Sequence, residues 1–361
     1  MRMNGMFGRA LAWARANLFQ SWGNGILTVI AVWLIAKVTW GALDWALLSA
    51  VFSGDDGSAC SGAKTGACWP FITHKLGLFL YGRYPEAERW RVLVVYALAA
   101  ASCAALCQPM VRATTKLASA ILLGAPVVCF FLLTGGWFGL HPVETELWGG
   151  LLVTLIVASV GIAAALPLGL ALALGRRSQL PVVRWLSVGF IEIVRGVPLI
   201  TVLFMASVML PLFLPPNVTF DKLLRALVGV GLFSAAYMAE VIRGGLQAVP
   251  RGQYMAADAL GLTEWQKMRL VVLPQALRVA IPGVVNSAIS LFKDTSLVLI
   301  IGLFDLLGVV QQSVQADAKW FAPSTAATGY VFAAALFWVF CFGMSRAAAL
   351  LEQRLAHATK R

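Results

Sequence analysis

The sequence predicts an all-α integral membrane protein with about eight transmembrane helices. Of its 361 residues, 60% are hydrophobic and 12% are charged, and the mean hydropathy is +0.82. Soluble domains carry roughly 45–50% apolar and about 25% charged residues, so this composition excludes a soluble globular protein. The apolar residues gather in several runs of about 20 residues, which is the length that a helix needs to cross a bilayer.

Eight runs are apolar and long enough to be predicted spans. Pro167 and Pro198 fall inside two of them, but membrane helices tolerate proline, so neither residue need split its span. The predicted spans are residues 24–43, 92–109, 117–138, 148–174, 185–214, 223–243, 279–303 and 328–350.

The distribution of Lys and Arg predicts the orientation of these spans. Both ends of the chain and alternate loops carry the majority of the basic residues. Because an excess of Lys and Arg marks cytoplasmic segments, we expect both termini in the cytoplasm and a long external loop at about 44–91. The basic residues flank apolar runs and form no single stripe, which argues against a nucleic-acid partner.

The cysteines and histidines bear on disulfides and metals. Cys60 and Cys68 lie in the expected external loop, where an oxidising compartment permits a disulfide between them; two free thiols are the alternative. The three His residues are isolated in the sequence and no C-x-x-C motif occurs. We therefore expect no metal site.

Motifs for nucleotide hydrolysis and for hydrolase chemistry are absent. The sequence has no G-x-x-x-x-G-K-[ST], no H-E-x-x-H and no G-x-S-x-G. We expect no enzymatic activity and no cofactor in this chain, so any energy must come from a partner or from an ion gradient.

One cytoplasmic loop, residues 243–278, is longer than the others and predicts two short helices with a corner. Residues 253–260 are rich in helix formers, and Gly261 supplies the break. Thr263 and Gln266 form a capping box at the start of the second helix. We expect Pro274 to interrupt that helix.

The first of these two helices carries Ala256, Ala257 and Ala259. A hairpin lying on the lipid surface would carry more Lys and Arg on its polar face. Small side chains favour close packing against another protein, so we interpret the loop as a docking surface. We expect a charge at Gly261 or Ala257 to uncouple the protein without lowering its abundance in the membrane.

A polar stripe runs along the seventh predicted span. At 100° per residue its members share about a third of the helix circumference, and Asp294 lies roughly 18 Å from Pro282, near the bilayer midplane. Such a stripe lines a path or a protein interface, and an ion pair of Lys293 and Asp294 with neighbouring helices is the alternative. The stripe consists of Asn286, Ser287, Ser290, Lys293 and Asp294, and Tyr237 of the sixth span faces the same path or packs in the core.

Two further acids lie inside predicted spans, each three residues before an arginine. Glu192 and Arg195 share a helix face, as do Glu240 and Arg243, so we predict two structural ion pairs. A rival interpretation is a proton-coupled secondary transporter or channel that uses Glu192, Glu240 and Asp294. That interpretation expects inverted repeats, which the two halves do not show.

Several motifs together resemble those of one known family. The loop sequence is similar to the coupling loop of ATP-binding-cassette (ABC) import permeases, and the full set resembles the polar amino-acid uptake family. The match covers residues 148–351. The motifs are Gly252-Gln253-x-x-Ala256-Ala257-x-Ala259-Leu260-Gly261-Leu262, Leu273-Pro274-Gln275-Ala276-Leu277-Arg278, Glu192-x-x-Arg195-Gly196-x-Pro198-Leu199, Tyr237-x-x-Glu240-x-x-Arg243-Gly244-Gly245 and Lys293-Asp294-Thr295-Ser296-Leu297.

The resemblance implies a domain plan. Residues 148–351 would form a five-helix core of the type I ABC importer fold, with the coupling loop at 243–278, and residues 352–361 a cytoplasmic tail. Residues 1–147 would be a three-span extension, similar to that of the longer membrane subunit of a proteobacterial general L-amino-acid transporter.

The resemblance also implies a permease of the bacterial inner membrane that moves L-amino acids into the cytoplasm. Its partners would be a second, related permease, two ATPases that bind ATP and Mg²⁺, and a periplasmic amino-acid-binding protein. The ATPases would dock on residues 251–274. Met255 departs from the family pattern, which has Glu there. The implied coupling residues are Gln253, Met255, Ala256, Ala257, Ala259, Gly261 and Leu262.

Overall fold

The computed structural model describes residues 12–62, 65–107, 115–137, 139–213, 215 and 220–358. The described residues form helices joined by loops, with three isolated β-bridges between loop residues and helix ends. It divides into two compact units, Met1–His74 with Val314–Gly329, and Lys75–Ser313 with Tyr330–Arg361. Residues 1–11 and 359–361, at the termini that we expect in the cytoplasm, lie outside the described residues.

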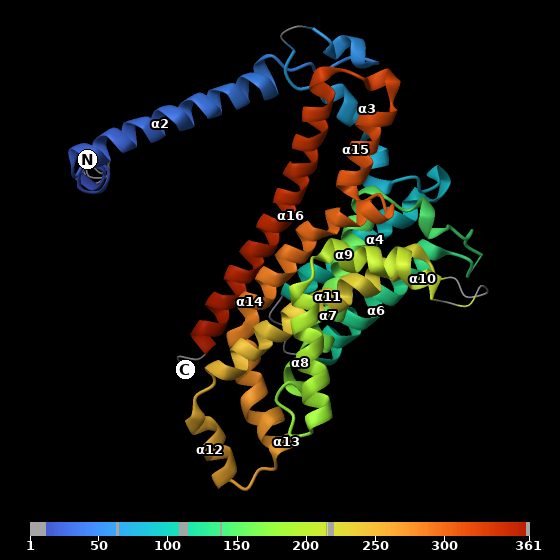
Figure 1. Cartoon of the computed structure of the whole chain (residues 1–361). Coiled ribbons are helices and arrows are strands. Elements are labelled where there is room, and N and C mark those ends of the chain that lie inside the picture. The colour runs from blue at the N-terminus through green and yellow to red at the C-terminus, as the bar shows by residue number, and fades with distance from the viewer. Residues whose placement is uncertain are drawn as a thin grey trace. The chain divides into compact units, whose positions relative to one another are not determined.

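The first unit begins with a long apolar helix, α2 (Trp22–Leu43), drawn in blue in Figure 1. The hydroxyl of Ser21 accepts a hydrogen bond from the N–H of Asn24 and so caps the helix. A π-helical turn, Asp44–Leu48, extends it to 27 residues. No residue of α2 is buried, as is expected of a helix that faces lipid.

A small lobe completes the first unit. Cys60 and Cys68 form a disulfide, so the expected external loop is closed at this point. The N–H of Cys68 donates to Thr328 Oγ1 over 2.8 Å, and Trp320 packs on Phe71. The loop also contains η2 (Gly57–Cys60) and the start of α3 (Trp69–Tyr81), a helix that the hydropathy pattern alone did not predict.

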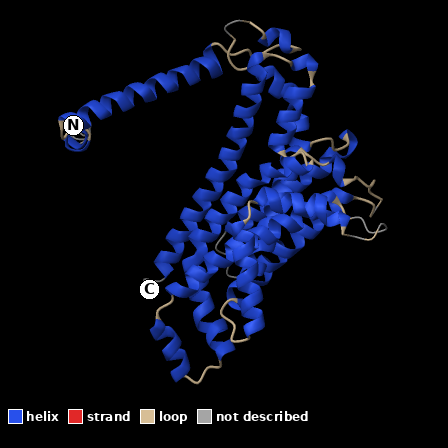
Figure 2. Ribbon diagram, in the orientation of Figure 1, coloured by secondary structure: helices blue, strands red, loops and turns tan. Residues whose placement is uncertain are grey.

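The second unit contains most of the predicted spans. Two helices precede the core and overlap predicted spans 92–109 and 117–138, but neither is among the described helices that are long and apolar enough to cross a membrane. The helices of the unit, shown as blue ribbons in Figure 2, are α4 (Arg89–Cys107), α6 (Thr115–Thr134), α7 (Gly150–Gly175), α8 (Pro181–Gly196), α9 (Leu199–Phe204), α10 (Leu210–Leu212), α11 (Lys222–Ala248), α12 (Arg251–Ala259), α13 (Glu264–Gln266), α14 (Leu273–Asp294), α15 (Leu306–Ala316) and α16 (Pro323–Ala358), the last two shared with the first unit.

Helices α7, α11 and α14 pack closely because small residues lie where they meet. A Cβ added at Gly169 would lie 2.7 Å from the Cβ of Met238, and one at Gly161 would lie 2.9 Å from Val230. Between membrane helices, where burial of apolar surface gives little advantage over lipid, such small residues let the backbones approach. These close contacts hold α7, α11 and α14 together around the region that contains the candidate site.

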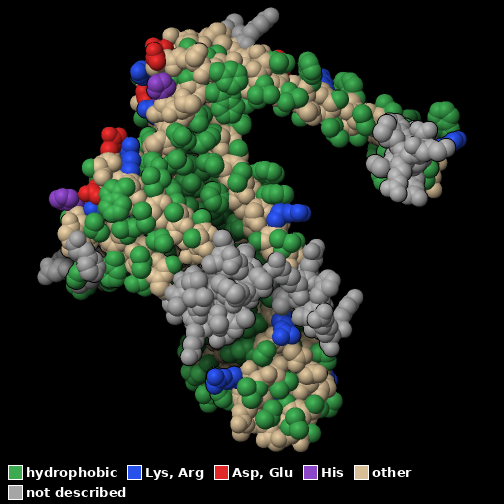
Figure 3. Space-filling model, turned by 180° about the vertical axis from the view of Figure 1, so that it is seen from behind, with side chains coloured by type: hydrophobic (Ala, Val, Ile, Leu, Met, Phe, Trp, Pro, Cys, Tyr) green, Lys and Arg blue, Asp and Glu red, His purple; other side chains and the backbone are tan. Residues whose placement is uncertain are grey.

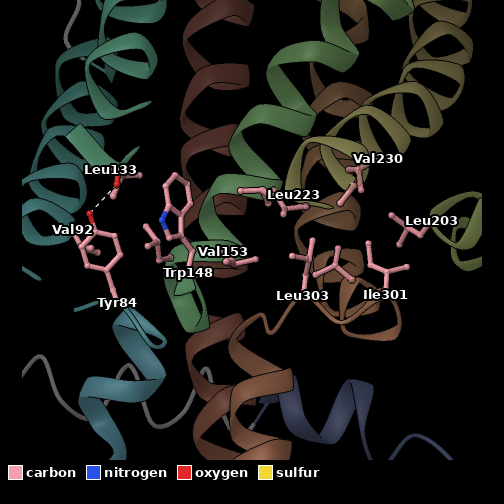
Figure 4. Close-up of a cluster of buried hydrophobic side chains, with 14 of the residues drawn as sticks. Tyr84, Val92, Leu133, Trp148, Val153, Leu203, Leu223, Val230, Ile301 and Leu303 are labelled. Atoms are coloured by element: carbon pink, nitrogen blue, oxygen red, sulfur yellow. Dashed lines mark hydrogen bonds between the residues drawn. The ribbon is translucent and has the colours of Figure 1, made fainter. Parts of the chain in front are cut away.

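A cluster of buried side chains surrounds the N-terminal end of α7 (Figure 4). Trp148 and Val153 pack there with Leu223 of α11 and Leu303, which follows α14. The hydroxyl of Tyr84 donates to the carbonyl oxygen of Leu133 over 2.9 Å, which satisfies a polar group inside the cluster.

Five described helices are long and apolar enough to cross a membrane, or six if one bent pair is counted as a single span. The bent pair corrects the prediction for residues 185–214, because α8 and the α9–α10 segment meet at 107°. The break lies at Pro198, whose ring disfavours a helical conformation at Val197, and Val197 is extended. Pro167, in contrast, lies inside an unbroken α7.

The second helix of the coupling loop also differs from the prediction. Pro274 does not end it: a continuous helical stretch runs from Glu264 to Ile301 over 38 residues. The stretch passes through a π-helical segment, Lys267–Val272, directly before Pro274. The wider π turn accommodates a residue that has no N–H to donate.

The surface of the molecule agrees with a membrane location. Hydrophobic side chains cover long stretches of the face shown in Figure 3, and the charged side chains there gather in a few places. Exposed apolar area on this scale is unusual for a soluble monomer.

Candidate translocation cavity and coupling loop

A cavity of about 330 Å³ lies between α7, α11 and α14. Its size is that of a small-molecule site, for which about 300–1,000 Å³ is usual. It is lined by Ile162 and Ala165 of α7, by Phe233, Ser234, Tyr237 and Met238 of α11, and by Asn286, Ser287, Ala288, Ser290, Leu291 and Asp294 of α14.

The structure brings four of the five expected pathway residues to this cavity. Asn286, Ser290 and Asp294 line it from one face of α14, and Tyr237 lines it from α11. Lys293 is the exception: its side chain is exposed and does not line the cavity. This corrects its place in the predicted pathway, because adjacent residues on a helix point about 100° apart.

Asp294 makes no ion pair with any residue that the structure describes, although Lys293 is its neighbour in the chain. A carboxylate in a cavity with amide and hydroxyl groups can hold a ligand's ammonium group, and those neutral groups can bind a ligand's carboxylate. The lining also includes the apolar side chains of Phe233, Met238 and Leu291. The cavity therefore suits a small zwitterion with an apolar portion.

A network of charged side chains lies on α11 beyond Tyr237. The carboxylate of Glu240 lies 2.8 Å from Arg176 Nη1 and 2.7 Å from Arg243 Nη2. Arg195 Nη1 lies 3.6 Å from the same carboxylate. Its side chain is 15% exposed. Three guanidinium groups on one carboxylate join the ends of α7, α8 and α11, so the network braces the core.

This network confirms one predicted ion pair and corrects the other. Glu240 and Arg243 form a pair. Glu192 and Arg195 do not: Glu192 contacts Arg176 at 3.1 Å, while Arg195 lies against Glu240 and over the ring of Tyr237 at 5.7 Å. Spacing within α8 made the local pair possible, but partners on α7 and α11 compete for both side chains.

Arg176 is the residue of the network that sequence reasoning missed. It follows α7 directly, at the end of a predicted span. An arginine at the end of a membrane span is common, so its position in the sequence did not indicate that it forms ion pairs. Only the packing of α8 and α11 beside that end shows its two carboxylate partners.

Helix α12 and the turn after it form the corner of the coupling loop. Gly261 has a positive φ of 71°, and no atom lies within 4 Å of the position that its Cβ would occupy. Thr263 and Gln266 form the expected capping box. The side chain of Tyr254 ties α12 to the core, since its hydroxyl bonds with Arg177 and with the carbonyl oxygen of Leu246.

The residues expected to contact a partner divide into two sets. Ala257 is buried, so a charge there would also be expected to disturb folding; the effect of a charge at Ala257 or Gly261 on coupling and abundance stays a prediction. Gln253 is exposed, although it also bonds with Gln275 at 3.0 Å. The others, Met255, Ala256, Ala259 and Gly261, are exposed, and Leu262 is half-buried.

Comparisons with known proteins agree with this architecture. The profile of a family described as "Binding-protein-dependent transport system inner membrane component" matches residues 165–357, which include the network, the coupling loop and every residue lining the cavity except Ile162. The chain is 53% identical to the inner membrane amino-acid ABC transporter permease protein YhdY of Escherichia coli strain K12, over 96% of this chain and 93% of that protein.

Two further proteins are similar. The glutamate/glutamine/aspartate/asparagine transport system permease protein BztC of Rhodobacter capsulatus is 39% identical, over 96% of this chain and 94% of that protein. A solved structure described as an amino acid ABC transporter with histidines is 30% identical, with a TM-score of 0.50, over 57% of this chain and 92% of that chain.

Proposed function

The chain belongs to the family of binding-protein-dependent transport system inner membrane components, and on that premise we propose that it is the permease subunit of an ATP-driven importer of L-amino acids. The similarity to YhdY and BztC over nearly the whole chain supports amino acids as the cargo. We propose that transport runs from the periplasm to the cytoplasm, with both termini in the cytoplasm.

The observation that carries this proposal is that Asp294 lines the cavity and makes no ion pair with a described residue. Asp294 would receive the ammonium group common to all amino acids, and Asn286, Ser290 and Tyr237 would bind polar groups of the same molecule. The wall formed by Phe233, Met238 and Leu291 leaves room for an apolar side chain. A site that recognises the shared groups more than the side chain fits an importer of broad specificity.

The coupling loop would transmit the energy. In the proposed assembly two permease subunits, this chain and a related one, face each other, and an ATPase docks on residues 251–274 of each. ATP and Mg²⁺ would be held by the ATPases. Closure of the ATPases would favour one access state of the cavity over the other, which requires only that they bind the two states with different affinity.

The ion network gives the cavity a connection to that loop. Tyr237 lines the cavity and carries Arg195 on its ring, and Arg195 lies against Glu240. Beyond this network on the same helix, Leu246 accepts the bond from Tyr254 of α12. A shift of α12 would therefore act on α11, which forms one wall of the cavity.

The remaining partner would be a periplasmic amino-acid-binding protein. We further propose that residues 1–147 are an extension outside the transport core, because the family profile begins only at residue 165. In this assignment α2 spans the membrane and the disulfide-closed lobe lies in the periplasm.

Replacing the cavity acid tests the proposal. We expect Asp294→Asn to reduce uptake of a labelled amino acid about tenfold or more, because a hydrogen bond to a charged group is worth about 1.5–3 kcal/mol. Lys293→Ala is the matched control, one residue along the same helix but outside the cavity, and should transport normally. Equal uptake by both variants would contradict the assignment of the cavity.

A second measurement separates the proposal from the proton-coupled alternative. Inner-membrane vesicles carrying the complete complex should take up amino acid only with ATP and the binding protein, and should continue when a protonophore collapses the proton gradient. Glu192 and Glu240 are held by arginines, which suits a brace better than a proton relay. Loss of uptake with the protonophore while ATP is maintained would favour the relay.

A further inference from the structure

A lysine lies inside the otherwise uncharged helix α2. Lys37 is the one charged residue between Trp22 and Leu43 in the sequence. At 1.5 Å per residue it lies about 20 Å beyond Asn24 and about 9 Å before Leu43, the two ends of the predicted span. The hydrocarbon core of a bilayer is about 30 Å thick, so in a spanning α2 the backbone of Lys37 lies within the hydrocarbon.

The ammonium group of Lys37 is directed toward the middle of this helix. Its Nζ lies over the ring of Trp33, 5.0 Å from the centroid and one turn nearer the N-terminus. Trp33 is at the middle of the predicted span 24–43. Helical side chains lean toward the N-terminus, so this direction follows from the geometry of the helix. A lysine that reaches the nearer membrane surface would have to extend toward Leu43, and Lys37 does not.

The contact with Trp33 satisfies this charge only in part. An ammonium group has three N–H donors, and the ring covers one side of it. Both side chains are exposed, and Lys37 makes no ion pair with any residue that the structure describes. Charged side chains at this depth almost always pair with another group inside a protein. Lys37 therefore requires a carboxylate that meets it within the membrane.

The nearest acid in the sequence is not placed to supply that carboxylate. Asp44 lies two turns from Lys37, toward the C-terminal end of α2, while the Lys37 side chain points the other way. The Asp44 carboxylate accepts a hydrogen bond from Ser49 Oγ over 3.1 Å. Asp44 is thus part of the turn that ends α2, at the start of the expected external loop.

The acids inside the spans of this chain are not available to Lys37 either. Each of the three is held by arginines or lines the cavity between α7, α11 and α14. They are Glu192, Glu240 and Asp294. A second copy of this chain would bring the same three acids in the same surroundings. The counter-charge for Lys37 must therefore come from a membrane protein of different sequence.

The face of α2 that carries Lys37 leaves room for another helix. Gly41 lies one turn further along this face, and no atom lies within 4 Å of the position that its Cβ would occupy. Small residues of this kind let the backbones of membrane helices approach. Trp40, at the edge of the same face, is 67% exposed. A second helix can thus lie against Gly41 and place a side chain beside Lys37.

We propose that α2 docks on a transmembrane helix of the second, related permease, and that an Asp or Glu of that helix forms an ion pair with Lys37 inside the bilayer. This inference rests on the proposed function, which places α2 across the membrane and supplies the related permease as a membrane subunit of different sequence. Lys37 lies outside residues 165–357, which match the family profile. The ion pair gives the N-terminal extension a role of its own, in holding the two permeases together.

Photo-crosslinking of the complete complex in native membranes tests this contact. With p-benzoylphenylalanine in place of Trp40, the related permease should be captured through a peptide that lies in a span and contains Asp or Glu. The same probe at Ile35 is the matched control, because Ile35 lies on the opposite face at similar depth and is 66% exposed. It should capture lipid alone. Capture of lipid alone from both positions, of a helix of this chain, or of a helix without an acid would overturn the proposal.

Charge variants show whether the ion pair holds the two helices together. Lys37→Met should lower the yield of the Trp40-probe adduct about fivefold or more, whereas Lys37→Arg keeps the charge and should stay within about twofold of wild type. Because methionine makes α2 more apolar, Lys37→Met should insert at least as well as wild type, and the yield is compared at equal abundance. A wild-type yield from Lys37→Met would show that the charge does not hold the contact.

The captured acid completes the test. Its replacement by the corresponding amide should lower the adduct yield as much as Lys37→Met does, and the double variant should lose no more than either single one, as expected for two residues that act as a pair. Additive losses would contradict the ion pair. Failure of the proposed function gives a different result: the captured protein would then co-purify with no ATPase, which would overturn its identification as the related permease. Intact ATP-driven uptake with capture of lipid alone would leave the importer standing and overturn this inference.

Discussion

Glu240 and Asp294 are both acidic residues within long apolar helices of the same core, and their surroundings differ completely. Glu240 is held by Arg176 and Arg243 and has Arg195 beside it. Asp294 lines a cavity and makes no ion pair with a described residue. A charge inside a membrane protein is costly wherever it lies, so the two sites show two ways in which the cost is offset.

At Glu240 the protein itself supplies the counter-charges, and the result is rigidity where α7, α8 and α11 end. At Asp294 no described residue supplies a counter-charge, and in the proposed function a ligand would supply it. Charge or apolar context alone does not distinguish the two residues. The difference arises from the charged side chains that the neighbouring helices place within 4 Å of each carboxylate.

The largest effect is expected from Glu240→Gln. This change removes the carboxylate that Arg195 and Arg243 face and leaves Arg176 with Glu192 alone. Because the guanidinium groups are partly exposed, we expect a loss of about 3 kcal/mol in the free energy of unfolding, the lower end of the range for breaking a buried ion pair. We expect a lower Tm in detergent and reduced abundance in the membrane. Asp294→Asn is the control, since it removes an unpaired charge and should leave Tm unchanged or higher. Equal losses of Tm in both variants would contradict the comparison.

A third buried acid, Asp305, lies outside the spans and separates the effect of burial from that of ion pairing. It caps α15, accepting hydrogen bonds from the N–H groups of Gly308 and Leu307, and it is fully buried. Burial raises the pKa of Asp305 to about 6, although those hydrogen bonds favour the charged form.

The sign of the resulting pH dependence follows from this shift. The unfolded chain loses the Asp305 proton near pH 4 and the folded chain near pH 6, so the free energy of unfolding falls as pH rises between these values, by about 3 kcal/mol. Asp305→Asn keeps an acceptor for Gly308 and cannot ionise. We expect its Tm relative to wild type to increase from pH 4 to pH 7; a constant difference would show that Asp305 does not carry this shift.

The sequence was sufficient to predict the membrane class and most of the polar residues that line the cavity, although it also placed Lys293 there. Helical periodicity on α14 placed Asn286, Ser290 and Asp294 on one face, and periodicity is a local property. The sequence could not predict the partner of Glu192, because Arg176 lies 16 residues earlier and reaches it only through the packing of α7 against α8. Similarly, the bend at Pro198 and the continuity at Pro274 depend on how each segment is supported by its neighbours.

Glu192→Gln should have the smallest effect. Its side chain is 56% exposed, and its contact is a single one to Arg176, which keeps Glu240 when Glu192 is neutralised. Exposed pairs contribute about 1 kcal/mol or less, so Tm and uptake should stay close to wild type. If Glu192→Gln instead lowers Tm as much as Glu240→Gln does, the five charges act as one unit. The double variant would then lose no more than either single one, and the brace would depend on the whole network, with no single carboxylate at its centre.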